Sequence, residues 1–139
     1  MPTLNAYVGS TIATPVTGLR FGVAWDLLNA HTTYVGTPVK ADAWSIAGYA
    51  SYQATEKLSF HGRFEYFTAM VEQPGLPTNN AIYATTLTAQ YDLWKNVMAR
   101  AEFRWDHAAD ESGPYGGSVV GGGHLDNSYI LLADIAYKF

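Results

Sequence analysis

The stretch LSFHGRFEYFTAMV, residues Leu58–Val71, alternates apolar and polar side chains over most of its length. Phe60 and Phe64 fall on one parity of this stretch, whereas Arg63 and Glu65 fall on the other. Successive side chains of a β-strand point to opposite faces, so a period of two predicts a strand. The strand predicted here has one charged face and one uncharged face.

The same split recurs in VMARAEFRWDH, residues Val97–His107, and along nearly the whole chain. A soluble antiparallel sheet covers its apolar face with a second layer of structure. No segment is left over here to form that layer, because nearly all of the sequence reads as strand. The pattern therefore favours a sheet whose apolar face meets lipid.

Composition limits the class of protein further. A chain of 139 residues predicts one domain, here residues 1–139 as a transmembrane β-barrel domain or the C-terminal portion of one. Its 12 acidic and 8 basic residues leave no basic surface for a nucleic acid. Cysteine is absent, which excludes disulfides and thiolate chemistry. No apolar run reaches the roughly 18 residues that a helical membrane span requires. This criterion does not apply to a β-barrel, because apolar residues occur at every second position of its strands.

Seven strands are predicted, each long enough to cross a bilayer at a tilt. Their connections alternate between tight turns and long loops, as at the two ends of an outer-membrane barrel. The expected fold class is all-β, an antiparallel up-and-down transmembrane β-barrel. The predicted strands are Thr3–Ala13, Val16–Leu28, Ala41–Ala54, Leu58–Val71, Ala81–Leu93, Val97–Asp106 and Asn127–Phe139. The predicted turns are Thr14-Pro15, Thr55–Lys57 and Trp94–Asn96, and the predicted loops are Asn29–Lys40, Glu72–Asn80 and His107–Asp126.

The charged residues fit this arrangement without exception. Each lies on the predicted inward side of a strand, in a connection or at a strand end, and none lies mid-strand on the other face. An Arg or Lys facing the bilayer midplane costs about 2–4 kcal/mol, so lipid contact explains the exclusion. The side chains predicted to line a lumen are Arg20, Asp26, His61, Arg63, Glu65, Gln90, Asp92, Arg100, Glu102, Arg104, Asp106, Asp134 and Lys138.

Aromatic side chains collect at both ends of the uncharged face, with an aliphatic band between them. Two such girdles are typical of the two interfaces of a bilayer. The core of a soluble barrel, the alternative, would favour large side chains at mid-height, where this chain has Ala99 and Ala101. The aromatics predicted at the lipid interface are Trp25, Trp44, Tyr66, Tyr83, Trp105 and Tyr129 at one end, and Phe21, Tyr52, Phe60, Tyr91, Tyr137 and Phe139 at the other.

The segments AQYDLWKN (Ala89–Asn96) and RAEFRWDH (Arg100–His107) resemble the OmpL-like β-barrel porin family of bacterial outer membranes. In that family a Tyr-Asp…Trp-Lys-Asn turn leads into an Arg-x-Glu-x-Arg-x-Asp strand, a Gly-rich loop and a final strand. The resemblance is close in the C-terminal part of the chain and rests on strand pattern elsewhere. Porins of this kind are larger, so the chain resembles their C-terminal half. The resemblance implies a channel for passive passage of small hydrophilic solutes.

The last strand closes on Phe139, which resembles the C-terminal signal read by the outer-membrane assembly machinery. No signal peptide precedes Thr3, so we expect a mature form or a fragment. Single-chain bacterial barrels have even strand counts, whereas seven is odd. Three explanations stay open: missing N-terminal strands, an eighth strand, or a parallel seam, of which the resemblance favours the first. Unpaired edges are not viable in lipid, so we expect missing strands or further chains to pair with the end strands.

One predicted strand face carries charges of alternating sign: Arg100, Glu102, Arg104 and Asp106. These side chains either set the local field for passing solutes or neutralise one another inside a narrow barrel. The predicted inward charges total five positive and six negative, which gives no strong ion preference. The sequence leaves both interpretations open.

Catalysis and metal binding are weaker hypotheses. Asp106 and His107 adjoin the longest predicted loop, but neighbours in a strand point to opposite faces, which argues against a pair that activates water. The acidic and histidine residues around that loop match no defined metal site: His107, Asp110, Glu111, His124 and Asp126. We expect no enzyme, no cofactor and no metal. The alternative to a channel is a non-conducting small barrel with a structural, adhesive or ligand-binding role through its loops.

Overall fold

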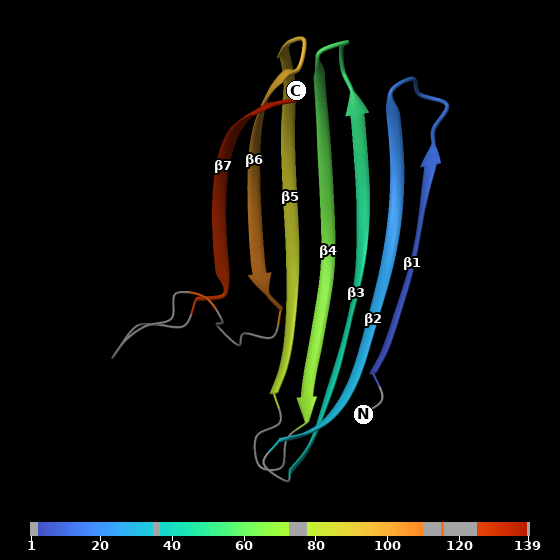
Figure 1. Ribbon diagram of the computed structural model, residues 1–139, viewed down its shortest axis with the longest axis vertical. Coiled ribbons are helices and arrows are strands. Elements are labelled where there is room, and N and C mark those ends of the chain that lie inside the picture. The colour runs from blue at the N-terminus through green and yellow to red at the C-terminus, as the bar shows by residue number, and fades with distance from the viewer. Residues whose placement is uncertain (1–2, 35–36, 73–77, 110–114, 116–124, 139) are drawn as a thin grey trace.

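The chain folds as a single antiparallel sheet of seven strands, in the order in which they follow along the sequence (Figure 1). The structure is a computed structural model, and it describes residues 3–34, 37–72, 78–109, 115 and 125–138. Each strand pairs with the next through an antiparallel ladder. The strands are β1 (Thr3–Ala13), β2 (Leu19–Tyr34), β3 (Thr37–Gln53), β4 (Leu58–Glu72), β5 (Thr78–Trp94), β6 (Val97–Ala108) and β7 (Asn127–Tyr137). The predicted strand number and topology are confirmed.

Tight turns join β1 to β2, β3 to β4 and β5 to β6 at one end of the sheet (Figure 1). The turn at residues 54–57 and the turn at Lys95-Asn96 lie where the sequence predicts them. Asn96 has a positive φ of 70°, which Asn tolerates better than most residues. The remaining connections lie at the opposite end (Figure 1). The β4–β5 and β6–β7 connections are long as predicted, but only two residues join β2 to β3, so the predicted alternation in length fails at that connection.

The first turn is longer than predicted. β2 begins at Leu19 rather than at Val16. The Leu19 amide donates to the Val16 carbonyl at 3.1 Å, and Gly18 adopts a φ of 80°. A left-handed residue cannot continue a strand, so the ladder starts only after Gly18.

The β2–β3 hairpin also extends further than predicted, and the predicted loop Asn29–Lys40 is wrong. Its ladder continues to the pair Tyr34↔Thr37. Thr, Tyr and Val are common in this segment and favour extended backbone, which allows the pairing to continue. β5 likewise begins at Thr78, inside the predicted loop Glu72–Asn80. At the other end β7 stops at Tyr137, and Phe139 lies outside the described residues.

β1 and β7 form the two edges of the sheet, and their described residues do not pair with each other. Because seven strands alternate in direction, β1 and β7 run the same way (Figure 1). The described sheet is therefore open, and that further strands pair with its edges stays a prediction.

The sheet has no core of large apolar side chains in its described part. The buried apolar residues are all alanines: Ala47, Ala81, Ala84 and Ala108. In contrast, Leu131 is 80% exposed and Ile135 is 72% exposed. A soluble domain buries such side chains between two layers, whereas this sheet has one layer. The described residues include no helix that is long and apolar enough to cross a membrane.

Candidate functional site: the charged face of the sheet

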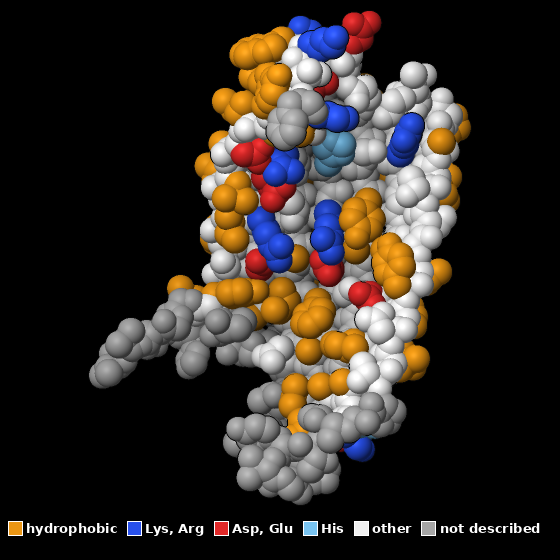
Figure 2. Space-filling model, viewed as in Figure 1, with side chains coloured by type: hydrophobic (Ala, Val, Ile, Leu, Met, Phe, Trp, Pro, Cys, Tyr) orange, Lys and Arg blue, Asp and Glu red, His pale blue; other side chains and the backbone are white. Residues whose placement is uncertain are grey.

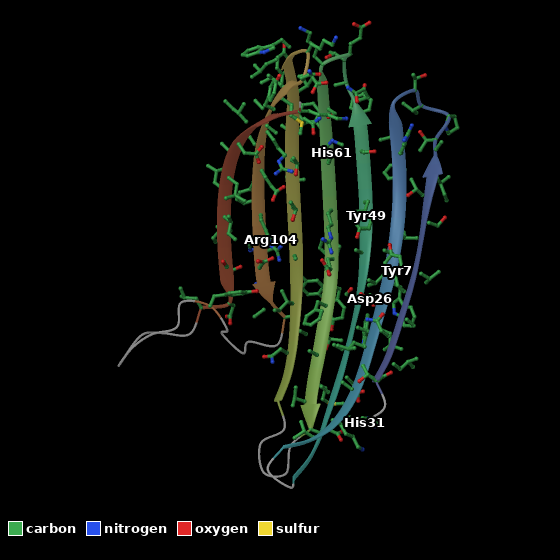
Figure 3. The ribbon with its side chains drawn as sticks, in the orientation of Figure 1. Tyr7, Asp26, His31, Tyr49, His61 and Arg104 are labelled. Atoms are coloured by element: carbon green, nitrogen blue, oxygen red, sulfur yellow. The ribbon has the colours of Figure 1, made fainter. Side chains whose placement is uncertain are left out.

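The register assigns each side chain to one face, because directly paired residues of neighbouring strands share a face. The predicted lumen residues that lie within the ladders all fall on the same face, which we call the charged face. Lys138 follows the end of β7 and lies outside the ladders. Figure 2 shows Arg, Lys, Asp, Glu and His side chains gathered across it. In Figure 3, His61 lies nearer the short turns than Tyr49 and Arg104, and Asp26 lies nearer the long connections. That this face lines a lumen stays a prediction.

A short motif of arginine, aromatic residue and carboxylate occurs on both β4 and β6. Arg63 forms a salt bridge with Glu65, and Arg104 Nε lies 2.9 Å from Asp106 Oδ1. Thr86 of β5 pairs in the register with both Arg63 and Arg104. The two ion pairs therefore lie at the same height, with one strand between them.

The two members of each ion pair differ in exposure. The Glu65 and Asp106 side chains are 18% and 12% exposed, against 44% for Arg63 and 45% for Arg104. Asp106 has room to lie low because its register neighbours, Ala84 and Ser128, are small. A solute approaching this part of the charged face meets guanidinium groups before carboxylates.

Two further charged residues of β6 bind side chains on other strands. Arg100 donates to Asp134 of β7 from Nη2 at 2.7 Å and from Nε at 2.9 Å. Glu102 accepts a hydrogen bond from the Thr88 hydroxyl of β5 at 3.1 Å. The charges of alternating sign on β6 are thus satisfied by three strands, and only Arg104 and Asp106 pair within the strand.

Several uncharged polar residues of the charged face were not predicted from the sequence. Tyr49, Ser51, Thr86 and Thr88 lie in the same registers as the charged residues of β4 and β6. Their positions on this face follow from the alternation of side chains along β3 and β5. Hydroxyl side chains occur on both faces of this sheet, as Thr85 shows, so residue type alone did not single them out.

The predicted interface aromatics that the structure describes lie on the opposite face, which we call the apolar face. Phe139 lies outside the described residues. At the end with the long connections, the Trp44 and Tyr66 rings lie 5.4 Å apart and the Tyr66 and Tyr83 rings 5.0 Å apart. Near the short turns, Tyr52 and Phe60 are register partners. These rings form two rows on the apolar face, and their contact with a lipid interface stays a prediction.

Among the described strand residues, charged side chains reach the apolar face only beyond the row that contains Trp44. Lys40, Asp42 and Glu72 share the parity of Trp44 and lie inside strands, because β3 and β4 extend further than predicted. Lys40 Nζ lies 3.7 Å from Glu72 Oε2, and the Asn29 amide donates to Asp42 Oδ1 at 2.6 Å. The uncharged band therefore ends near the Trp44 row.

Asp106 and His107 point to opposite faces, as the strand parity predicts. His107 pairs with Tyr83 on the apolar face, and its Nδ1 atom lies 3.1 Å from Asn127 Oδ1. The same oxygen accepts from the Trp105 indole at 2.9 Å. Asp106 is on the charged face, so the two side chains do not form an acid–base pair.

In the segment between β6 and β7, Tyr115 lies near Asp106. Tyr115 pairs with Leu125 through a backbone bridge. Burial and the nearby Asp106 carboxylate raise the pKa of the Tyr115 phenol, against a smaller opposite effect of Arg104. Among the described residues no group of three or more His, Asp or Glu side chains could hold a metal ion. Asp110, Glu111 and His124 lie outside the described residues.

Residues 7–139 match the family model described as Putative beta-barrel porin-2, OmpL-like. A search of curated proteins finds no match to the chain. The matching family is a family of porins rather than of enzymes, and porins reside in membranes as closed β-barrels. The seven antiparallel strands, the charged face and the apolar face agree with such a barrel wall. The chain belongs to the Putative beta-barrel porin-2, OmpL-like family.

Proposed function

We propose that the sheet forms part of the wall of a pore in the bacterial outer membrane, through which small hydrophilic solutes pass passively. The separation of the two faces carries this proposal. Arg63 and Arg104 are half-exposed on the charged face, while Leu131 and Ile135 are largely exposed on the apolar face. A wall with water on one side and lipid on the other needs this distribution.

The dimensions of the apolar face support the proposal. Trp44 and Tyr52 delimit the uncharged band on β3 and are eight residues apart. At about 3.3 Å per residue this separation is about 26 Å along the strand, and a tilt of about 40° shortens it to about 20 Å along the membrane normal. The apolar band of an outer-membrane barrel is about 25 Å tall. The two aromatic rows therefore suit the two interfaces of one bilayer.

Small residues on the charged face leave room for the larger side chains beside them. Gly22, Ala24, Ala47 and Ala84 all lie on this face at mid-height, and Ala47 and Ala84 are buried. Arg63 and Arg104 nevertheless stay half-exposed. The interior of an eight-stranded barrel is just filled by side chains, so a hydrated lumen requires a wall of more strands.

Closure of the barrel requires strands in addition to β1–β7. Because β1 and β7 run in the same direction, an odd number of further strands between them completes an all-antiparallel wall. Copies of residues 1–139 with one orientation in the membrane would meet only through parallel pairing. We therefore propose that further strands pair with both edges, and that β7 contacts the outer-membrane assembly machinery.

Planar-bilayer recording tests the channel. The assembly, extracted from membranes in mild detergent, is expected to give discrete conductance steps. Replacing Thr86 on the charged face by Trp should lower the step size, because the ring projects into the lumen. Thr85→Trp is the matched control, since Thr85 lies next to it on the apolar face and should leave the steps unchanged. A protein that never conducts would favour the structural or adhesive alternative, and equal effects of the two variants would refute the lumen assignment.

A further inference from the structure

We propose that a hollow on the charged face, between β2 and β5, binds small oxyanions such as phosphate monoesters or carboxylates. The hollow has a volume of about 320 Å³ and is open on one side. Its charged and titratable lining groups are Arg20, His61 and Arg63, and no carboxylate lines it. The binding of an anion in the hollow is inferred from this geometry alone. Only an effect of this binding on the passage of solutes rests on the proposed function.

The register brings the basic groups together from two strands. Arg20 of β2 and His61 of β4 both pair with Ser51 of β3, so they lie in one row across three strands. Arg63 lies one row further along the same face of β4. Neighbouring strands are about 4.8 Å apart, so the backbones of Arg20 and His61, on either side of β3, are about 10 Å apart. The side chains of Arg20, His61 and Arg63 all line the same hollow, where one small anion can contact them.

The two arginines retain donors for a ligand. Arg20 is exposed and forms no salt bridge with any other described residue. Arg63 binds Glu65, and its guanidinium carbon lies 5.5 Å from the centre of the Tyr49 ring. These two contacts hold the guanidinium in place, yet 44% of the side chain remains exposed. An arginine has five N–H donors, more than these contacts use.

The rest of the lining is rich in hydroxyl groups. Thr11, Tyr49, Ser51, Thr86 and Thr88 contribute to it. A hydroxyl can donate to the oxygens of an anion and can donate to or accept from the hydroxyls of an attached sugar. Arginine forks match carboxylate and phosphate oxygens in geometry as well as in charge. The lining is therefore suited to an oxygen-rich anion rather than to a metal cation or an apolar molecule.

The nearby acidic residues do not cancel this local charge. Glu65 lies low against the sheet and is already bound to Arg63. Glu102 lies in the row of His61 but on β6, beyond Thr88, from which it accepts a hydrogen bond. The total count of charges on the charged face predicts no preference between cations and anions. The positions of these charges nevertheless leave the hollow basic.

Binding of inorganic phosphate to the detergent-solubilised assembly tests the site, with ³¹P NMR line broadening at low salt as the readout. The unmodified protein should broaden the signal in a saturable way that added salt weakens. Arg20→Gln should weaken binding about tenfold, as the loss of one charge-assisted contact predicts. Because Arg20 has no salt bridge to lose, this variant should fold normally. The double variant Arg63→Gln/Glu65→Gln should weaken binding similarly without leaving a lone carboxylate.

Arg100→Gln is the matched control, because it removes the same charge from the same face but outside the hollow. It should change phosphate binding less than twofold. Absence of saturable binding, or equal weakening by Arg20→Gln and Arg100→Gln, would overturn the site. Phosphate binding by a protein without conductance would support the site and refute the channel. Conductance without phosphate binding would support the channel and refute the site.

Discussion

Arg104 Nε lies within hydrogen-bond distance of both carboxylate oxygens of Asp106, at 2.9 Å and 3.0 Å. Asp106 is buried, with 12% of its side chain exposed, and its neighbours in the register are Ala84 and Ser128. A carboxylate at this depth needs its counter-charge, because desolvation of an unpaired charge is costly.

Arg104→Gln should therefore lower the free energy of unfolding by about 3 kcal/mol. The double variant Arg104→Gln/Asp106→Asn should recover most of this loss, because the buried charge is then absent. Arg100→Gln serves as the control, since its ion pair with Asp134 is exposed and contributes about 0–1 kcal/mol. Urea unfolding in lipid vesicles measures all three variants. Equal losses for Arg104→Gln and Arg100→Gln would contradict the role of burial.

Two adjacent leucines on β7 test the assignment of the faces. Leu131 pairs with Phe103 on the apolar face, and Leu132 pairs with Glu102 on the charged face. Leu131→Arg should destabilise the folded protein in vesicles by about 2–4 kcal/mol, because the charge would face lipid. Leu132→Arg should cost much less, since water and Glu102 are available on its face. The opposite ranking in the same urea unfolding assay would refute the assignment.

The first turn depends on the left-handed backbone of Gly18. A Cβ atom at this position would lie 2.8 Å from the Gln53 carbonyl oxygen, and the φ of 80° disfavours any side chain. Gly18→Ala should therefore lower the free energy of unfolding by about 1–3 kcal/mol. Gly48→Ala is the control, because a Cβ at Gly48 meets no atom within 4 Å. A stability loss as large for Gly48→Ala would show that the effect is not specific to the turn.

Hydrogen exchange of the membrane-embedded assembly tests whether the sheet edges have partners. Each unpaired backbone group in hydrocarbon costs several kcal/mol, so the edges of β1 and β7 should be paired. Mass spectrometry should then find amides of β1 and β7 as protected as those of β4, which has strands on both sides. Fast exchange in β1 or β7 beside slow exchange in β4 would show that the sheet remains open at that edge.

Tyr115 should remain a neutral phenol at alkaline pH at which ordinary tyrosines ionise. Burial is the larger cause of its raised pKa and the Asp106 carboxylate the second, so Asp106→Asn should lower that pKa only in part. The difference in phenolate absorbance between the protein and its Tyr115→Phe variant isolates this group. Because the folded-state pKa is raised, its contribution to stability is present below about pH 10 and is lost as the pH rises through the folded-state pKa. A Tyr115 that titrates at or below the ordinary pKa would contradict this environment.

The sequence by itself determined which face each strand residue occupies. Alternation is a local property of extended backbone, so Arg63 and Glu65 could be separated from Phe64 without knowledge of any neighbour. The same locality explains the correct prediction of the turn at residues 54–57 and of the start of β4 at Leu58. The prediction from sequence failed beyond Asn29, where local signals were weak. Neither the alternation of side chains nor the positions of Pro and Gly indicated that β2 and β3 continue to pair there.

Only the tertiary structure decided which residues meet across strands. Arg63 and Arg104 lie at one height because both are register partners of Thr86. Arg100 binds Asp134, which is 34 positions away in the chain. Register depends on the lengths of all the intervening turns, and a shift along one strand would change every cross-strand pair. The basic hollow is a product of that register, because its arginines and hydroxyl groups come from strands whose separate sequences carry no sign of their alignment.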